Sequence, residues 1–225
     1  MLILILPVCG VLIGFPWNTD TMFEVFYYSF YYHNIMMGLF LAYLIALSFL
    51  YKTTDNSMML IHMKKRSTYI KFLLQAVVEI ALALSLYYMA VNLLIGKCFI
   101  RDGMDWGGIE MSFPMLMMTF LRSTMALFCL LFLLGMIYLV TALASQNTVL
   151  SSVVVYIFYG VDIAATFYTG ISPVICRYIP KSVLYFQDTE FVHNMPYMLG
   201  FACVGGITLI YQIIKKDFLH RKGDE

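Results

Sequence analysis

Three ionisable residues lie inside long apolar stretches, where a charge can take part in chemistry or transport: Glu79, Arg122 and Asp162. A charge at the centre of a membrane helix costs at least ~2.5–3.5 kcal/mol, so we expect each to face a bundle interior or a water-filled cavity. There it can contact a substrate or a gate, or form a buried pair that locks two helices together. For Arg122 a place at the outer membrane interface is the further alternative, because its apolar stretch is long.

The sequence lacks the motifs of the common enzyme classes. It contains no G-x-x-x-x-G-K-[ST] phosphate loop, no H-E-x-x-H zinc motif and no G-x-S-x-G nucleophile elbow. The stretch from Tyr159 to Asp162 faintly resembles an intramembrane aspartyl protease, but that chemistry needs two aspartates and no second membrane aspartate exists. The five cysteines are widely spaced, without a C-x-x-C pair. We therefore predict no catalytic residue and no metal site in this chain.

Composition sets the class of protein that must position these residues. Of the 225 residues, 62% are hydrophobic and 12% are charged, and the mean hydropathy is +0.83. A soluble domain carries about 25% charged residues, so this chain has too few charges to cover a soluble surface. The values exclude a soluble enzyme, a nucleic-acid-binding protein and a disordered scaffold. They predict a multi-pass protein of the cell membrane, surrounded by lipid.

Apolar segments give the expected architecture. Six of them lie near residues 2–17, 33–51, 70–95, 114–144, 148–170 and 196–214. Since one crossing takes about 20 residues, six leave no room for a separate soluble domain. The first segment contains Pro7 but lacks the basic start and the cleavage site of a signal peptide, so we expect a membrane helix. The predicted fold is all-α, a single polytopic domain of six transmembrane helices over residues 1–225.

Basic residues set the expected orientation. Nine lie in two short stretches: Lys52, Lys64, Lys65, Arg66, Lys71, Lys215, Lys216, Arg221 and Lys222. The opposite loops hold four basic residues, namely Lys97, Arg101, Arg177 and Lys181, beside seven acidic ones. By the positive-inside rule, the 51–71 segment and both termini are predicted to be cytoplasmic.

Small residues recur at the spacing of helix contacts. Gly10 and Gly14 form a G-x-x-x-G pair in the first segment, and Gly160 and Ala164 form a similar pair in the fifth. Such pairs allow two helix backbones to approach closely in lipid. They can serve packing within the chain or a dimer interface, and we favour packing within the chain.

The segment over residues 55–70 is the most informative part of the sequence. Its apolar and polar residues predict a short amphipathic helix on the inner face, which contains the basic run Lys64-Lys65-Arg66. Such a run commonly anchors a membrane protein to anionic headgroups; the alternative is a docking point for a cytoplasmic partner.

This segment resembles the coupling helix of type-2 ABC exporters, in their membrane (permease) subunit. That helix typically has an acidic residue, one or two small residues, a leucine pair and a basic, serine-rich step; here the corresponding residues are Asp55, Ser57, Leu60, Ile61, Lys64, Lys65 and Arg66. Six helices and a basic cytoplasmic tail also agree with the family. The chain departs from it at the start, where the usual amphipathic helix before the first crossing is missing.

The resemblance implies that this chain forms a translocation path and couples to a separate cytoplasmic ATPase subunit. The partner would bind ATP and Mg²⁺, and the chain itself would hold no cofactor. A second copy, or a paralogous membrane subunit, would complete the pore. The family fold does not fix the cargo. An apolar bundle with 17 methionines and 18 phenylalanines suits a hydrophobic or antimicrobial peptide, a lipid or a drug, and core packing explains these residues equally well. The remaining alternatives are the substrate-binding membrane module of a vitamin importer, an intramembrane enzyme and an accessory factor.

Overall fold

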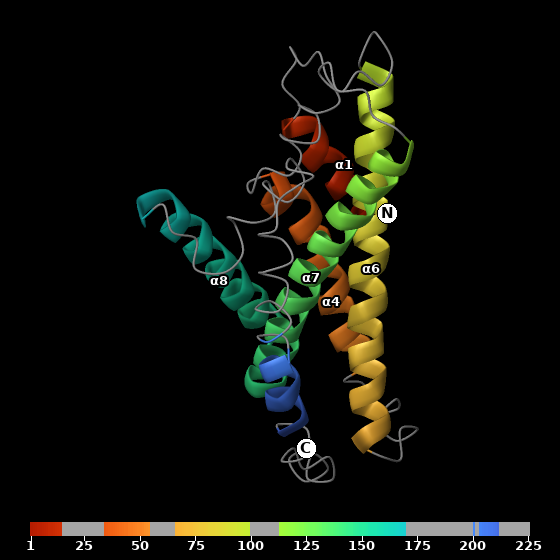
Figure 1. Cartoon of the computed structure of the whole chain (residues 1–225). Coiled ribbons are helices and arrows are strands. Elements are labelled where there is room, and N and C mark those ends of the chain that lie inside the picture. Colours follow the sequence, from red (N-terminus) through yellow and green to blue (C-terminus); the bar gives the residue numbers. More distant parts are fainter. Residues whose placement is uncertain (15–33, 55–65, 100–112, 170–199, 201–202, 212–225) are drawn as a thin grey trace.

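The computed structural model of the chain describes residues 1–14, 34–54, 66–99, 113–169, 200 and 203–211. Every regular element in this part of the chain is a helix (Figure 1), which confirms the all-α fold for these residues. The elements are α1 (Leu2–Gly14), the π-helix η1 (Ile35–Phe40), α4 (Leu41–Thr54), α6 (Arg66–Phe99), α7 (Phe113–Ser145) and α8 (Thr148–Thr169). Residues 203–211 add a short helical stretch near the C-terminus.

Three helical stretches are long and apolar enough to cross a membrane. They are Ile35–Thr54, which combines η1 and α4, Thr68–Cys98 within α6 and Leu116–Ser145 within α7. The helix α1 has 13 residues, which span about 20 Å and fall short of the ~30 Å hydrocarbon layer. The described residues therefore support a helical membrane protein, while the six crossings and the cytoplasmic termini stay predictions.

The antiparallel pair α6 and α7 forms the longest part of the bundle. The two helices have 34 and 33 residues, about 50 Å each, so they must tilt to match a bilayer. Figure 1 shows α7 crossing α6 obliquely. We predicted that the third crossing begins near residue 70, but α6 already begins at Arg66. The buried face of α6 starts at Tyr69 and continues at Leu73, and this packing extends the helix into the predicted coupling segment.

The core lies where α4, α6 and α7 meet. Tyr43 of α4 is fully buried, and its hydroxyl lies against Gly135 of α7, with Val77 of α6 beside it. A Cβ atom at residue 135 would collide with the Tyr43 hydroxyl and lie 2.8 Å from the Val77 side chain. Gly135 thus provides the space that lets a tyrosine enter this three-helix junction.

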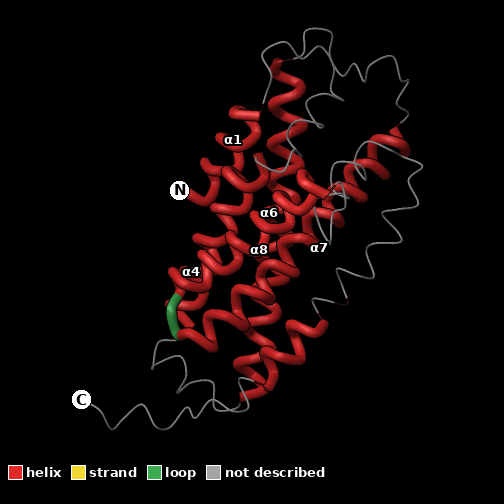
Figure 2. The backbone as a smooth tube through the Cα atoms, turned by 90° about the vertical axis from the view of Figure 1, so that its left-hand side faces the viewer, coloured by secondary structure: helices red, strands yellow, loops and turns green. Residues whose placement is uncertain are grey.

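A tight turn joins α7 to α8. Gln146 has a φ of 53°, in the left-handed region that ends helices, and its amide donates to the Ala142 carbonyl at 2.9 Å. Asn147 then caps α8, because its Oδ1 accepts from the amides of Val149 and Leu150 at 2.9 and 3.2 Å. From this turn α8 inclines away from the bundle, as Figures 1 and 2 show from two directions.

Candidate functional site

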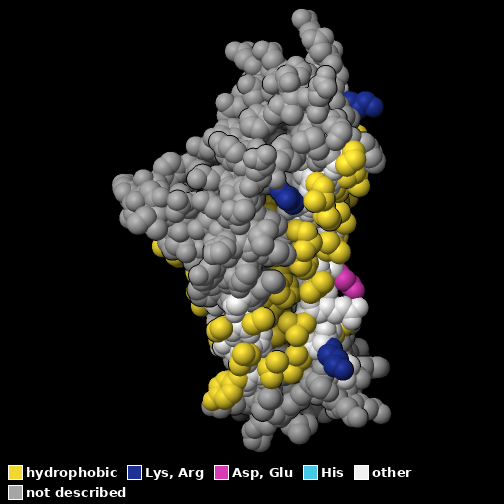
Figure 3. All heavy atoms as spheres, in the orientation of Figure 1, with side chains coloured by type: hydrophobic (Ala, Val, Ile, Leu, Met, Phe, Trp, Pro, Cys, Tyr) yellow, Lys and Arg dark blue, Asp and Glu magenta, His cyan; other side chains and the backbone are white. Residues whose placement is uncertain are grey.

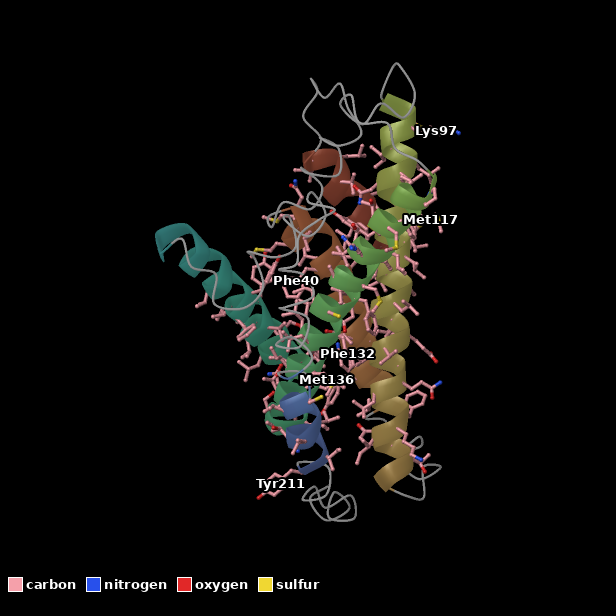
Figure 4. All side chains as sticks on the ribbon, viewed as in Figure 1. Phe40, Lys97, Met117, Phe132, Met136 and Tyr211 are labelled. Carbon is pink, nitrogen blue, oxygen red and sulfur yellow. The ribbon has the colours of Figure 1, made fainter. Side chains whose placement is uncertain are left out.

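The residues on either side of residues 55–65 lie at one end of the bundle. The helix α4 ends at Thr54, and α6 begins at Arg66. Asp55, Ser57, Leu60, Ile61, Lys64 and Lys65 lie outside the described residues, and Arg66 is the first residue of α6. Figure 4 places Tyr211 at this same end and Lys97 at the opposite one. The coupling end is the name we use below for the end defined by Thr54, Arg66 and the α7–α8 turn.

The helix α4 links the coupling end to the rest of the bundle. It packs against α1, α6, α7 and α8. Its buried residues include Tyr43, Leu47 and Tyr51, which recur every fourth residue and so lie on one face of the helix. A displacement of the chain below Thr54 would therefore act on a helix that contacts every other named helix of the described part.

The three predicted membrane charges occupy different environments. Glu79 lies on an exposed face of α6 and accepts a hydrogen bond of 2.8 Å from the Gln75 amide. It does not face the interior of the described bundle, and the alternative that it lies in a water-filled cavity stays a prediction. A neighbouring amide one turn away gives its carboxylate a local partner instead. Arg122 is half-buried in α7 and has a partner. Asp162 belongs to α8, but its side chain lies outside the described residues.

The two pairs of small residues behave differently. Gly10 of α1 packs directly on Gly38 of η1: a Cβ built on either would lie 2.7 Å from the Cα of the other. Packing within the chain is thus confirmed for Gly10, whereas the surroundings of Gly14, the last residue of α1, are outside the description. A Cβ at Gly160 would meet nothing within 4 Å, and Ala164 is exposed. The α8 pair therefore contacts no other described helix on its own face, and its role in packing or at a dimer interface stays a prediction.

A cleft opens between α4 and α8 near the coupling end. Its volume is about 410 Å³, and its lining residues are Leu41, Leu44, Ile45, Ser48, Phe49, Lys52 and Ser152. The size falls within the range of small-molecule sites. Apolar side chains make up most of the lining, and the polar groups are two serines and one lysine.

Hydroxyl groups from three helices join at the floor of this cleft. The Ser48 and Tyr138 hydroxyls are 3.0 Å apart, and the Tyr138 hydroxyl also interacts with that of Ser152. Ser152 in turn donates to the Thr148 carbonyl at 3.0 Å. Tyr138 of α7 thereby connects α4 to α8, and this contact holds the two walls of the cleft together.

Neither this cleft nor η1 was predicted from the sequence. Ser48 and Lys52 are one helical turn apart, which places them on one face, but their partners on α7 and α8 are about a hundred residues away. In η1, Phe40 stacks on Tyr156 of α8, with ring centroids 5.7 Å apart, and meets the Tyr159 ring in a tilted arrangement at 5.4 Å. Figure 4 shows Phe40 on the side of the bundle that faces α8.

No cluster of three histidine, cysteine, aspartate or glutamate side chains occurs among the described residues, so none of them forms a candidate metal site. The described surface is largely apolar, as Figure 3 shows on one face. No family model, no curated protein and no solved structure matches this chain. The geometry of the coupling end and of the cleft is therefore the basis for a proposed function.

Proposed function

We propose that this chain is the transmembrane subunit of an ATP-driven exporter of the type-2 ABC class. In this proposal residues 55–70 receive the movement of a separate cytoplasmic ATPase, and the helical bundle forms the translocation path. ATP and Mg²⁺ bind to the partner, and a second copy or a related membrane subunit completes the transporter. The cargo is a hydrophobic or amphipathic compound, such as a peptide or a lipid.

The observation that carries the proposal is the continuity between the predicted coupling segment and α4. That helix runs directly into residue 55 and packs against α1, α6, α7 and α8. The other flank, α6, forms one continuous helix of 34 residues from Arg66. A push on the connecting segment would reach both flanking helices and could shift the bundle between two arrangements, which is what coupling to ATP requires.

Charge agrees with a docking role for the coupling end. Lys71 is exposed on the flanking helix α6, and Lys64, Lys65 and Arg66 add three more positive charges nearby in sequence. Such a concentration attracts an acidic protein surface and steers its approach.

Affinity purification of the full chain from its native membrane in mild detergent tests the proposal. We expect a soluble ATPase to co-elute in stoichiometric amount. Exchange of Lys64 and Lys65 for glutamate should remove it, and Lys97→Glu, which reverses a charge at the opposite end, should retain it. A well-folded sample without any ATPase would contradict the proposal, as would equal retention by the charge-reversed coupling variant and the wild type.

Uncoupling gives a second readout. Leu60→Pro should break the short coupling helix. The ATPase that co-purifies should still hydrolyse ATP, but its rate of hydrolysis should no longer change when the complex is reconstituted in lipid. If hydrolysis by the Leu60→Pro complex responds as the wild type does, residues 55–70 are not the coupling element.

A further inference from the structure

The cleft between α4 and α8 has the dimensions of half a bilayer. Lys52 lies two residues before the end of α4, and Leu41, the uppermost lining residue on that helix, lies eleven residues before Lys52. At about 1.5 Å per residue this separation is about 16 Å, close to half of the ~30 Å hydrocarbon layer. The cleft thus extends from the membrane interface to the middle of the membrane.

The lining changes character along this length. Leu41, Leu44 and Ile45 form the inner part on α4, where nothing polar from that helix enters the cleft. Ser48, Ser152 and Lys52 supply all of its polar groups, and on α4 they lie toward the coupling end. A ligand that fits both parts has an apolar chain of about half a bilayer and a polar head at the membrane interface.

Lys52 favours a ligand whose polar head carries a negative charge. It is exposed, and no other described residue forms an ion pair with its ammonium group. A lysine at a helix end extends its charge to the level of the lipid headgroups, where a phosphate provides a charge-assisted partner. Lys52 thus places a positive charge in the lining of the cleft, at its end toward Thr54.

The serines lie deeper than Lys52, between the phosphate level and the apolar part of the cleft. This is the level of the glycerol backbone of a phospholipid, where polar ester groups begin. Ser152 donates its proton to the Thr148 carbonyl, so the polar part of the cleft adds no charge, and Lys52 is the charged group of its lining. A phospholipid whose head carries a net negative charge fits this order, and phosphatidylglycerol is such a lipid.

We propose that the α4–α8 cleft is a binding site for one anionic phospholipid of the phosphatidylglycerol type, with its phosphate at Lys52 and an acyl chain along Leu41, Leu44 and Ile45. The lipid would cover the apolar walls between two helices that diverge. This site does not depend on the proposed export function, because it needs neither an ATPase nor a cargo.

Native mass spectrometry of the purified full chain, delipidated and titrated with palmitoyl-oleoyl phosphatidylglycerol or with the matching phosphatidylcholine, tests the site. We expect the first phosphatidylglycerol to bind about tenfold more tightly than the first phosphatidylcholine. Lys52→Gln should remove most of this difference, since the loss of one charge-assisted contact corresponds to about a factor of ten. Lys71→Gln, which removes an exposed lysine near the same end but outside the cleft, should leave the difference unchanged.

A second pair of variants tests where the acyl chain of the lipid lies. Ile45 is 41% exposed and lines the cleft, whereas Ile157 is 59% exposed on α8 and does not. Ile45→Trp should fill the inner cleft and weaken the first lipid, while Ile157→Trp should have no effect. Because both side chains are exposed, both variants are expected to fold.

Each contrary result overturns the proposal. Equal affinity for the two lipids in the wild type would show that the head charge is not recognised. Equal losses in Lys52→Gln and Lys71→Gln would show a general attraction to the basic end of the bundle. An unchanged first binding step in Ile45→Trp would place the lipid outside the cleft.

Discussion

Replacement of Gly10 by alanine tests the backbone contact between α1 and η1. The added Cβ would lie 2.7 Å from the Gly38 Cα and 2.9 Å from the Asn34 carbonyl oxygen. Both neighbours are backbone atoms, so no side-chain rotation can relieve the contact. Carbon atoms pack at about 3.5–4.0 Å, and α1 must therefore move away from η1 by about 1 Å.

The loss in the free energy of unfolding follows from the contacts between α1 and η1 that this movement separates. The crossing is reciprocal, since a Cβ at Gly38 would lie 2.9 Å from the Leu6 carbonyl oxygen, and α1 also packs against α4 and α6. Overpacking of this kind costs typically ~1–3 kcal/mol, and we expect Gly10→Ala to destabilise the protein within this range. The variant with alanine at both glycines should lose less than the sum of the two single losses, because one separation relieves both contacts.

Thermal unfolding followed by thiol labelling measures the effect. Cys129 in α7 is 3% exposed, so a thiol reagent reaches it only when the bundle opens. The labelled fraction of Cys129, resolved by mass spectrometry from the exposed Cys9, Cys98 and Cys203, reports opening at each temperature. Gly10→Ala should lower the labelling midpoint.

Gly160→Ala is the matched control. The new methyl group meets nothing within 4 Å, and alanine is favoured over glycine in a helix by up to about 1 kcal/mol. We expect an unchanged or slightly higher midpoint. A wild-type midpoint for Gly10→Ala, or a lower midpoint for Gly160→Ala than for Gly10→Ala, would refute the assigned packing.

Two further substitutions examine single polar groups. Asn147→Ala removes the cap of α8 and should cost ~1 kcal/mol, seen as faster hydrogen exchange at the Val149 and Leu150 amides; Asn147→Asp retains the acceptor and should exchange as the wild type does, and equal rates in all three proteins would contradict the cap. Ser123 is fully buried, and its hydroxyl has no hydrogen-bond partner among the described residues, so Ser123→Ala should raise stability by ~1 kcal/mol. Ser85→Ala removes a bond of 2.7 Å to the Ala81 carbonyl and should not raise it; a gain in Ser85→Ala that equals the gain in Ser123→Ala would show that the missing partner is not the cause.

Hydropathy predicted the positions of α7 and α8 well. The reason is that the apolar character of a helix can be read from its own segment, without knowledge of its neighbours. The segment predicted near 114–144 corresponds to α7 at Phe113–Ser145, and the segment near 148–170 corresponds to α8 at Thr148–Thr169. The start of the third helix was placed four residues too late, at residue 70 instead of Arg66. The first three residues of α6 are polar, so a hydropathy profile does not include them. Tyr69, which follows them, is buried against the bundle, and such packing does not appear in a hydropathy profile.

Side-chain environments were predicted less well, because each depends on a partner elsewhere in the chain. Glu79 is apolar-flanked in sequence, yet it lies on an exposed face beside Gln75. The hydropathy of α6 is high on both its buried and its exposed faces: Val77 is fully buried, while Leu86 is 43% exposed. With apolar residues all round, the helix carries no amphipathic stripe that could tell which side faces the bundle.

The two pairs of small residues show why such a motif needs a second helix to be interpreted. Gly10 and Gly160 have the same local spacing, and both allow a close approach. What differs is the neighbour: Gly38 presents a second bare backbone to Gly10, whereas α8 has no described helix beside Gly160. A G-x-x-x-G pair therefore states that a contact is permitted, and the contact is realised only where a second helix crosses at the same depth. A glycine at the corresponding depth on an adjacent segment, as at residue 38, is the feature a sequence search should require before it assigns packing to such a pair.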